Sequence, residues 1–274
     1  MAVITFLGTG DSMGVPRVYC RCQVCNEARL EGVNRRLRSS IWIDFSESET
    51  PDPLQTFLAE AREASETELL LDCGPDWASQ MEAIGIRQLH RVLLTHAHHD
   101  HIGGLPEWAD ACRWLGVRGT VYAPEEVNKA CIERYPWIAN HLEFLAIDQG
   151  ITLHGWEIAP WKVSHGKNGY SFAYQFAAGD RSWVYCSDAI HLNDDEKAPM
   201  NDVDMLILGT SFYREPYEMS TRSVYDIVEG IGVVKETRAA RAVFTHMSHD
   251  VDVRNTYDLP GHISLARTGR KIIV

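Results

Sequence analysis

Short apolar runs recur along the chain, and each is followed by a residue that can bind a metal or carry a proton. Runs of this length, rich in β-branched and aromatic residues, predict β-strands. Because the polar residues fall just past strand ends, we expect one site along one edge of the sheets. The pairs are "RVLLT" (91–95) with His96, "APWKVS" (159–164) with His165, "SWVYCS" (182–187) with Asp188, and "RAVFT" (241–245) with His246.

The rest of the pattern adds an N-terminal strand and intervening helices. "MAVITFLGTGDS" predicts a strand that runs into a glycine turn, whereas "LPEWADACRWLG" (105–116) and "TRSVYDIVEGIGVVKE" (221–236) predict helices. This pattern predicts strand-rich layers covered by helices, in one domain that spans residues 1–274. The polar segment 46–68, with helical spacing at Leu54, Leu58 and Ala61, is interpreted as an insertion between the strands "SSIWIDF" and "ELLLDCG".

Composition limits the functional classes. The 45% hydrophobic and 23% charged fractions are ordinary for a globular protein. No stretch approaches the ~20 apolar residues of a membrane span, and the N-terminus lacks the pattern of a secretory signal. We therefore expect a cytoplasmic protein with no membrane partner. The net charge of −12 argues against extensive nucleic-acid binding, which usually leaves a basic footprint.

Seven cysteines are present, and three of them form the cluster "CRCQVC" at Cys20, Cys22 and Cys25. In a reducing compartment such spacing indicates metal binding before disulfide formation. A closed zinc site takes four protein ligands, so one is missing from the cluster. The other cysteines lie in apolar contexts typical of inert core thiols, namely Cys73, Cys112, Cys131 and Cys186.

The strongest signal is "THAHHDHIGG" (95–104). His96 and His98 are two residues apart, so in an extended segment both point toward one ion. Asp100 and His101 fall where two glycines imply a change of direction, which allows them to face a second ion. Nitrogen and oxygen ligands suit zinc, manganese, iron or similar divalent metals. His99 is expected to be a bystander.

"HAHHDH" resembles the signature of the metallo-β-lactamase superfamily, and "ELLLDCG", "KVSHG", "YCSDA" and "VFTHMSH" agree with that family in order. The resemblance implies an α/β (α+β) fold, the αββα sandwich of two mixed β-sheets flanked by helices. It makes Asp72 an aspartate that supports the metal loop. It further implies that His96, His98 and His165 hold the first metal, that Asp100, His101 and His246 hold the second, and that Asp188 bridges both.

The residue at position 188 bears on function, because two-zinc β-lactamases usually have a cysteine at the matching place. A histidine and aspartate set resembles instead the hydrolases of phosphodiesters and thioesters. Two divalent ions ~3.5–4 Å apart lower the pKa of a shared water toward ~7 and clamp the attacking and leaving oxygens. The leading hypothesis is a binuclear phosphodiesterase for small cyclic or linear substrates. Alternatives are a thioester or lactone hydrolase and a non-hydrolytic cofactor-biosynthesis protein, with homodimer assembly left open.

"VYCRCQVCNEARL" and "NRRLRSS" are similar to the branch that holds the cyclic-phosphate phosphodiesterase of bacterial phosphonate breakdown and the pyrroloquinoline quinone biosynthesis protein B. That phosphodiesterase branch has a histidine thought to assist the leaving group, and the matching stretch here, "SFYREPYEMSTRSVYD", has none. Arg222 near that place is a candidate phosphate-binding residue. His191 is either a candidate acid or a bystander. Arg35, Arg36 and Arg38 form the basic stretch that follows the cysteine cluster, and their simplest interpretation is a solvated face.

The resemblance also supplies the missing ligand of the cysteine cluster. The related phosphodiesterase has a second histidine at the place of His249, three residues after His246. Three thiolates and one imidazole would close a tetrahedral structural zinc site. The alternative is an exposed His249, with Asp250 or water completing the zinc.

Overall fold

Two seven-stranded β-sheets form the centre of the molecule in the computed structural model, which describes residues 1–30, 32–46 and 62–274. The first sheet has the order β16-β1-β2-β4-β6-β7-β8, and the second has the order β15-β14-β13-β12-β11-β10-β9. The strands of the first sheet are β1 (Val3–Gly8), β2 (Ser40–Asp44), β4 (Glu68–Leu71), β6 (Arg91–Leu93), β7 (Gly119–Ala123), β8 (Leu142–Ala146) and β16 (Lys271–Ile273). Those of the second are β9 (Ile151–Leu153), β10 (Trp156–Ser164), β11 (Tyr170–Ala178), β12 (Arg181–Cys186), β13 (Met205–Gly209), β14 (Ala242–Thr245) and β15 (Ile263–Leu265).

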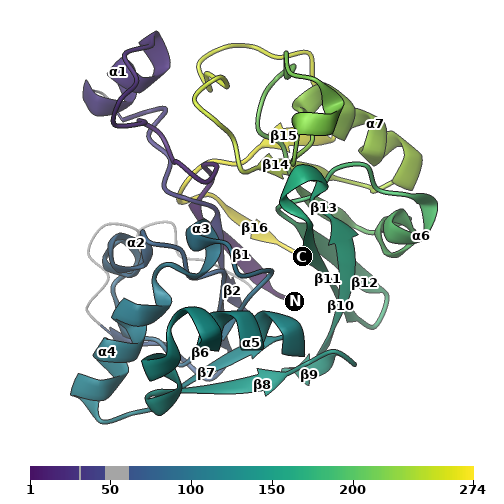
Figure 1. The fold of residues 1–274 in the computed structure, drawn as a ribbon. Helices are drawn as coiled ribbons and strands as arrows, with labels where there is room; N and C mark the ends of the chain where they lie inside the picture. Colours follow the sequence, from purple (N-terminus) through teal and green to yellow (C-terminus); the bar gives the residue numbers. More distant parts are fainter. Residues whose placement is uncertain (31, 47–61) are drawn as a thin grey trace.

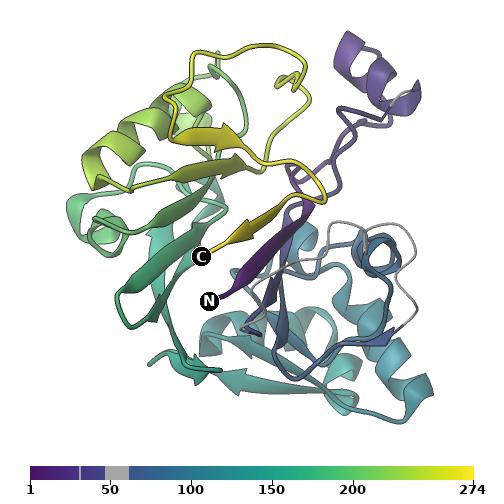
Figure 2. The same cartoon turned by 180° about the vertical axis from the view of Figure 1, so that it is seen from behind.

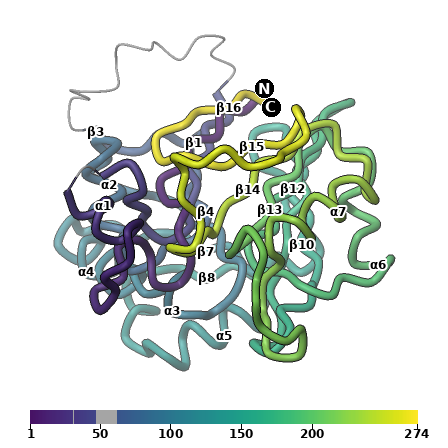
Figure 3. The backbone as a smooth tube through the Cα atoms, turned by 90° about the horizontal axis from the view of Figure 1, so that it is seen from above, coloured from purple at the N-terminus to yellow at the C-terminus, as the bar shows by residue number. Residues whose placement is uncertain are grey.

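Helices cover the outer sides of the two sheets (Figure 1). One group lies along the first sheet, a second group lies along the second, and α1 projects away from both (Figures 1 and 2). The first group is α2 (Trp77–Ile84), α4 (Leu105–Leu115) and α5 (Glu125–Arg134), the second is α6 (Asp194–Lys197) and α7 (Ile227–Thr237), and the others are α1 (Gln23–Leu30) and α3 (His99–Ile102). Both termini lie side by side at β1 and β16 (Figure 3). The αββα sandwich expected from the sequence is confirmed.

One hydrophobic core fills the space between the sheets. Phe6 and Ile43 of the first sheet and Trp183 and Phe244 of the second are fully buried in the same cluster. The hydroxyl of Tyr174 in β11 donates to the Leu94 carbonyl oxygen, which follows β6, at 2.6 Å. Because this buried bond joins the two sheets, it fixes the segment that precedes His96 relative to the second sheet.

The strand directions bring several chain segments to one edge. β12, β13 and β14 pair in parallel, as do β4 and β6, so the carboxyl ends within each set lie at a common edge. β10 runs antiparallel to β11, and β11 runs antiparallel to β12, so β10 ends at the same edge as β12. Among the described residues, no helix is long and apolar enough to cross a membrane.

The two helices predicted from periodicity differ in accuracy. The first agrees with α4, which ends at Gly116 in the left-handed region (φ 67°), a conformation that glycine adopts readily. The second was predicted to begin at residue 221 but begins at Ile227, because Asp226 and Glu229 form a capping box. The predicted insertion 46–68 falls largely outside the described residues. Its described end forms β3 (Arg62–Glu63), which pairs with β5 (Ile86–Gln88).

Candidate metal centre

Two residues of the candidate centre have strained backbone. Asp72 follows β4 with a φ of 64°, and His246 follows β14 with a φ of 59°. Residues other than glycine rarely adopt this left-handed backbone region, and backbone strain of this kind is common at functional sites. Asp72 is held there by its own amide, which donates to the Leu93 carbonyl oxygen at 2.8 Å.

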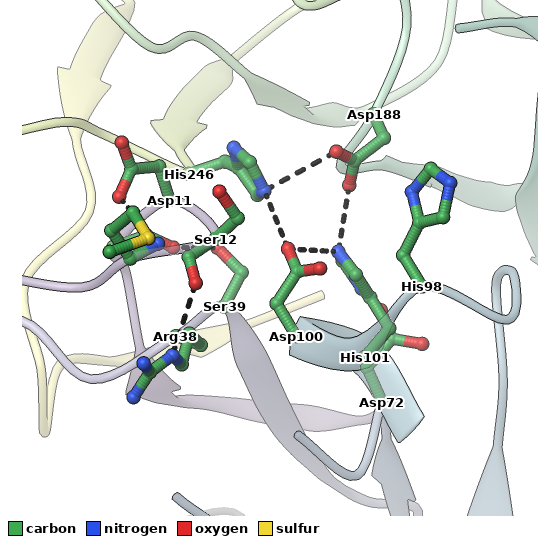
Figure 4. Close-up of polar contacts among 12 residues, drawn as sticks. Asp11, Ser12, Arg38, Ser39, Asp72, His98, Asp100, His101, Asp188 and His246 are labelled. Atoms are coloured by element: carbon green, nitrogen blue, oxygen red, sulfur yellow. Dashed lines mark hydrogen bonds and ion pairs between the residues drawn. The ribbon is translucent and has the colours of Figure 1, made fainter. Parts of the chain in front are cut away.

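The seven predicted ligands gather at the shared sheet edge in overlapping groups. In each group the ligand atoms lie within 4.8 Å of one another. Asp188 lies between the two ends of the centre: its Oδ1 is 3.3 Å from His246 Nε2 and 3.6 Å from His165 Nε2, and its Oδ2 is 3.2 Å from His101 Nε2. Figure 4 shows Asp188 and Asp100 converging on His101 and His246. The groups are His96, His98 and His165; His96, His101 and Asp188; and Asp100, His101 and His246.

Hydrogen bonds on the far side of the rings orient three of the histidines. The Asp72 carboxylate accepts from His101 Nδ1 at 2.7 Å, and the Ser223 carbonyl oxygen accepts from His165 Nδ1 at 2.6 Å. His96 Nδ1 lies 2.9 Å from the Thr95 hydroxyl. Each contact leaves Nε2 facing the centre, as in proteins whose metal-binding histidines are fixed by a neighbouring acceptor.

The buried carboxylates of the candidate centre favour positive charge beside them. Burial lowers the pKa of His101, but the carboxylates of Asp100, Asp72 and Asp188 outweigh it and hold that pKa well above its ordinary value. Burial raises the pKa of Asp188, but His246, His101 and His165 bring it well below its usual range. The lowered pKa of Asp188 favours its ionised form, and a cation beside it would offset its buried charge.

The residues present fit a pair of divalent ions. Nε2 of His101 and of His246, together with Oδ2 of Asp188, are buried and lack hydrogen-bond partners among the described residues. Buried polar atoms without partners are rare and call for a ligand. Ligand bonds of about 2.0–2.2 Å, the usual range for nitrogen and oxygen on zinc, place neighbouring ligand atoms roughly 3–3.5 Å apart. The separations of 3.2 and 3.3 Å around Asp188 lie in that range.

A second candidate metal site brings a cysteine segment near the N-terminus together with a histidine near the C-terminus. His249 Nδ1 lies 3.2 Å from the sulfur of Cys20, 3.5 Å from that of Cys22 and 3.3 Å from that of Cys25. Three backbone amides, those of Arg17, Cys22 and Cys25, also donate to sulfur atoms of the group. Three sulfur atoms around one imidazole nitrogen match the donor set of a closed structural zinc site.

The loop that carries His246 and His249 is fixed by a buried arginine. Nη2 of Arg36 donates to the carbonyl oxygens of Ser248 at 2.8 Å and of Val251 at 2.9 Å. Burial lowers the pKa of Arg36 to about 10. Since only 4% of this residue is exposed, the solvated-face interpretation does not apply to it.

Arg222 occupies a different environment from the one predicted. Its side chain is 4% exposed and ion-paired with Glu215 at 3.1 Å, with Asp226 at 3.7 Å and with Glu229. Nη1 also donates to Glu229 Oε1 at 2.9 Å. A guanidinium that is buried among three carboxylates has no free face for a phosphate, so the geometry contradicts the predicted phosphate role. Arg222 instead anchors the start of α7, and its carbonyl oxygen accepts from Lys167 just after His165.

We expect Arg222→Ala to lower the stability of the protein by roughly 3–5 kcal/mol, because it leaves buried carboxylates without their cation. Urea unfolding followed by circular dichroism measures this loss. The exposed Arg214 is the matched control, and its alanine variant is expected to change stability by less than about 0.5 kcal/mol. Unchanged stability of the Arg222 variant together with a selective loss of phosphate binding would restore the predicted role.

The other residues singled out in the sequence are two exposed histidines and four buried cysteines. His191 is exposed, has a φ of 58°, and its Nε2 is 3.4 Å from the Met219 carbonyl oxygen. His99 is exposed and belongs to none of the ligand groups. The four remaining cysteines are buried free thiols, as predicted. Sequence reasoning missed two ion pairs. Arg17–Asp11 belongs to no recognised motif, and the partners Arg38 and Asp76 are 38 residues apart in the chain.

A model of the β-lactamase superfamily domain matches residues 67–247, so the chain belongs to that superfamily. Its members are mostly hydrolases, and the fold binds divalent metals. The solved structure of a diphosphatase of the PhnP family shares 27% sequence identity with this chain. The match covers 100% of this chain and 98% of the diphosphatase, with a TM-score of 0.80. Zn²⁺-bound PqqB from Methylobacterium extorquens shares 19% identity over 99% of this chain and 100% of its own, with a TM-score of 0.75.

A curated relative, the octanoyltransferase of Porphyromonas gingivalis, is 24% identical over 98% of this chain. The match covers 51% of that relative, so the chain spans about half its length. The predicted resemblance to the metallo-β-lactamase superfamily is confirmed. The predicted branch, which holds the phosphonate-breakdown phosphodiesterase (PhnP) and the pyrroloquinoline quinone biosynthesis protein B (PqqB), is confirmed as well.

Proposed function

We propose that the chain is a binuclear metal-dependent hydrolase that acts on small cyclic or linear phosphodiesters. The observation that carries this proposal is the position of Asp188 between two sets of ligands, with one carboxylate oxygen toward His165 and His246 and the other toward His101. A carboxylate placed in this way can bridge two ions. When bound, such ions supply a water of lowered pKa and stabilise charge on the attacking and leaving oxygens.

The residues of the chain divide the remaining tasks. His96, His98 and His165 hold one ion, whereas Asp100, His101 and His246 hold the other. Asp72 keeps His101 in the tautomer that leaves Nε2 available to the metal. Asp100 belongs to the catalytic residues because its carboxylate faces the same space as Asp188 (Figure 4). The exposed ring of His191, on the loop that follows Asp188, is the candidate donor of a proton to the leaving group.

Zinc or manganese fits the active-site donor set, and a separate zinc fits Cys20, Cys22, Cys25 and His249. The similarity over the whole chain to a protein named a diphosphatase favours a substrate that is cleaved at phosphorus. The similarity to a protein named octanoyltransferase favours acyl cleavage as a second candidate, in which a thioester or lactone is hydrolysed.

The test is a panel of substrates assayed with protein loaded with zinc or with manganese. It contains bis-p-nitrophenyl phosphate, cyclic nucleotides, nucleoside diphosphates, acyl thioesters and lactones. Hydrolysis of phosphodiesters alone supports the proposal, and hydrolysis of thioesters or lactones alone favours the second candidate. Silence on the whole panel with both metals would contradict both and favour a non-hydrolytic role on the same scaffold.

A further inference from the structure

Glu196 in α6 bonds to its own helix cap and also to a neighbouring strand. Its Oε2 accepts from the Asn193 amide and its own amide donates to Asn193 Oδ1, both at 2.9 Å, so the two residues form a capping box. Its Oε1 accepts from the amide of Ser164, the last residue of β10, at 2.7 Å. The predicted ligand His165 follows directly in the chain. One oxygen of the Glu196 carboxylate therefore holds the end of the strand that leads to His165.

Ser164 is hydrogen-bonded through its carbonyl oxygen as well. That oxygen accepts from the Ile190 amide at 2.9 Å, and Ile190 forms a parallel bridge with His165. Ile190 lies two residues after Asp188. These bonds join the segment with His165 to the segment with Asp188, where His165 Nε2 and Asp188 Oδ1 face each other across 3.6 Å. The spacing of these two predicted ligands thus depends on the position of Ser164.

β10 also fixes the main chain of Glu196. Nε1 of Trp161 in β10 donates to the Glu196 carbonyl oxygen at 2.9 Å. The main chain and the carboxylate of Glu196 are therefore both bonded to this strand. Hydrogen bonds from backbone amides to a carboxylate are roughly twice as strong as bonds between neutral groups. Glu196 is half-buried, which limits competition from water for the bond to Ser164.

The ring of His165 is oriented by a different contact. Its Nδ1 donates to the Ser223 carbonyl oxygen at 2.6 Å, which sets the direction in which Nε2 points. The bonds of Ser164 instead set the position of the His165 main chain relative to Asp188. A metal site requires ligands held within about 0.5 Å of the productive geometry, so both kinds of contact bear on metal affinity.

We propose that Glu196 is a positioning residue that sets the spacing between His165 and Asp188, and thereby the affinity for the ion on the His165 side of the centre. This inference rests on the two-ion centre of the proposed function and adds a residue outside its ligand set. The Glu196 carboxylate bonds to Ser164 and Asn193, neither of which is a predicted ligand, so it acts through the Ser164 amide. Replacement of a residue that supports a metal ligand typically costs about 10–100-fold in metal affinity or activity.

The experiment is a calorimetric titration with Mn²⁺ of protein whose catalytic ions have been removed with a chelator. Glu196→Ala is expected to weaken the binding of one Mn²⁺ about 10–100-fold and to leave the other affinity close to that of the wild type. Asn193→Ala is the matched control, because it removes the side-chain cap of α6 and leaves the bond between Glu196 and Ser164. It should lower the melting temperature slightly and leave both Mn²⁺ affinities unchanged.

Two ligand variants identify the ion that Glu196 affects. Because Glu196 acts through His165, Glu196→Ala should lower Mn²⁺ affinity no further when it is combined with His165→Ala. Its full effect should remain when it is combined with His246→Ala. Unchanged affinities in Glu196→Ala, or equal losses in Glu196→Ala and Asn193→Ala, would overturn the proposal and leave Glu196 a helix cap. Loss of the structural zinc or of helical circular dichroism in Glu196→Ala would also overturn it, as general damage to the fold.

The titration does not require turnover, so it separates this inference from the proposed function. A wild type that binds two Mn²⁺ ions but hydrolyses nothing in the substrate panel contradicts the proposed hydrolase alone. A wild type that binds a single Mn²⁺ contradicts the two-ion centre. The affinity of Glu196→Ala for that ion, compared with the affinity of Asn193→Ala, then decides whether Glu196 positions a ligand.

Discussion

Replacement of Asp188 with alanine is expected to abolish hydrolysis, with a loss of about 10³-fold or more in kcat. The carboxylate faces both ligand groups, so with two ions bound its removal would take one ligand from each of them. The Lewis-acid contribution of bound metal is several kcal/mol, and ~4 kcal/mol corresponds to about 10³ in rate. Steady-state assays on the substrate that emerges from the panel measure this loss.

Metal analysis separates this effect from damage to the fold. The wild type is expected to hold about two catalytic ions per chain in addition to any structural zinc. Asp188→Ala should lose catalytic metal and retain the structural zinc, and His96→Ala should behave similarly. The exposed Asp195 is the control, because its alanine variant should keep both metal and activity. Turnover like that of the wild type in the Asp188 variant would refute the binuclear mechanism.

Replacement of His249 with alanine is expected to remove about one zinc per chain and to lower the melting temperature. Loss of one of four ligands opens the site, and structural zinc contributes directly to folding free energy. Activity should fall as well, because the loop with His246 would lose its connection to the cysteine segment. Metal analysis, calorimetric melting and turnover are measured on the same preparation.

His262 is the matched control for this prediction, since it is exposed and lies outside the candidate ligand groups. Its alanine variant should keep zinc content, melting temperature and activity. Unchanged zinc content and melting temperature in His249→Ala would mean that Asp250 or water completes the site. The carboxylate of Asp250 lies 3.4 Å from His249 Nε2, whereas Nδ1 of the same ring faces the cysteine sulfur atoms. We therefore expect His249 rather than Asp250 to bind the zinc.

Sequence reasoning predicted the strands well because their signals are local, and the candidate ligands that it named lie together in the structure. Alternation and apolar runs depend on neighbours a few residues apart, and the spacing of His96, His98, Asp100 and His101 lies within one short segment. The start of α7 was also readable locally, since Asp226 and Glu229 have the spacing of a capping box. The predicted start at residue 221 was wrong because apolar periodicity alone does not locate a helix cap.

The roles of the arginines were not readable in this way. Arg35, Arg36 and Arg38 lie within four residues of one another, yet Arg35 is exposed, Arg36 is buried against the loop of His249, and Arg38 is ion-paired with Asp76. Their environments are set by Ser248 and Asp76, which are distant in the chain. Arg222 likewise looked free for phosphate until packing placed it among three carboxylates.

The sequence by itself predicted strand-rich layers and the ligand-type residues of one short motif, because strand periodicity and motif spacing are properties of short segments. The resemblance to a known superfamily implied the sandwich and the full set of candidate ligands. Only the tertiary structure decided which arginines are buried, which nitrogen of each histidine faces the candidate centre, and how Asp188 lies between the two ligand groups. Those outcomes depend on contacts between residues up to 229 positions apart, as for Cys20 and His249. Burial and charge at such contacts follow from packing, which no local pattern encodes.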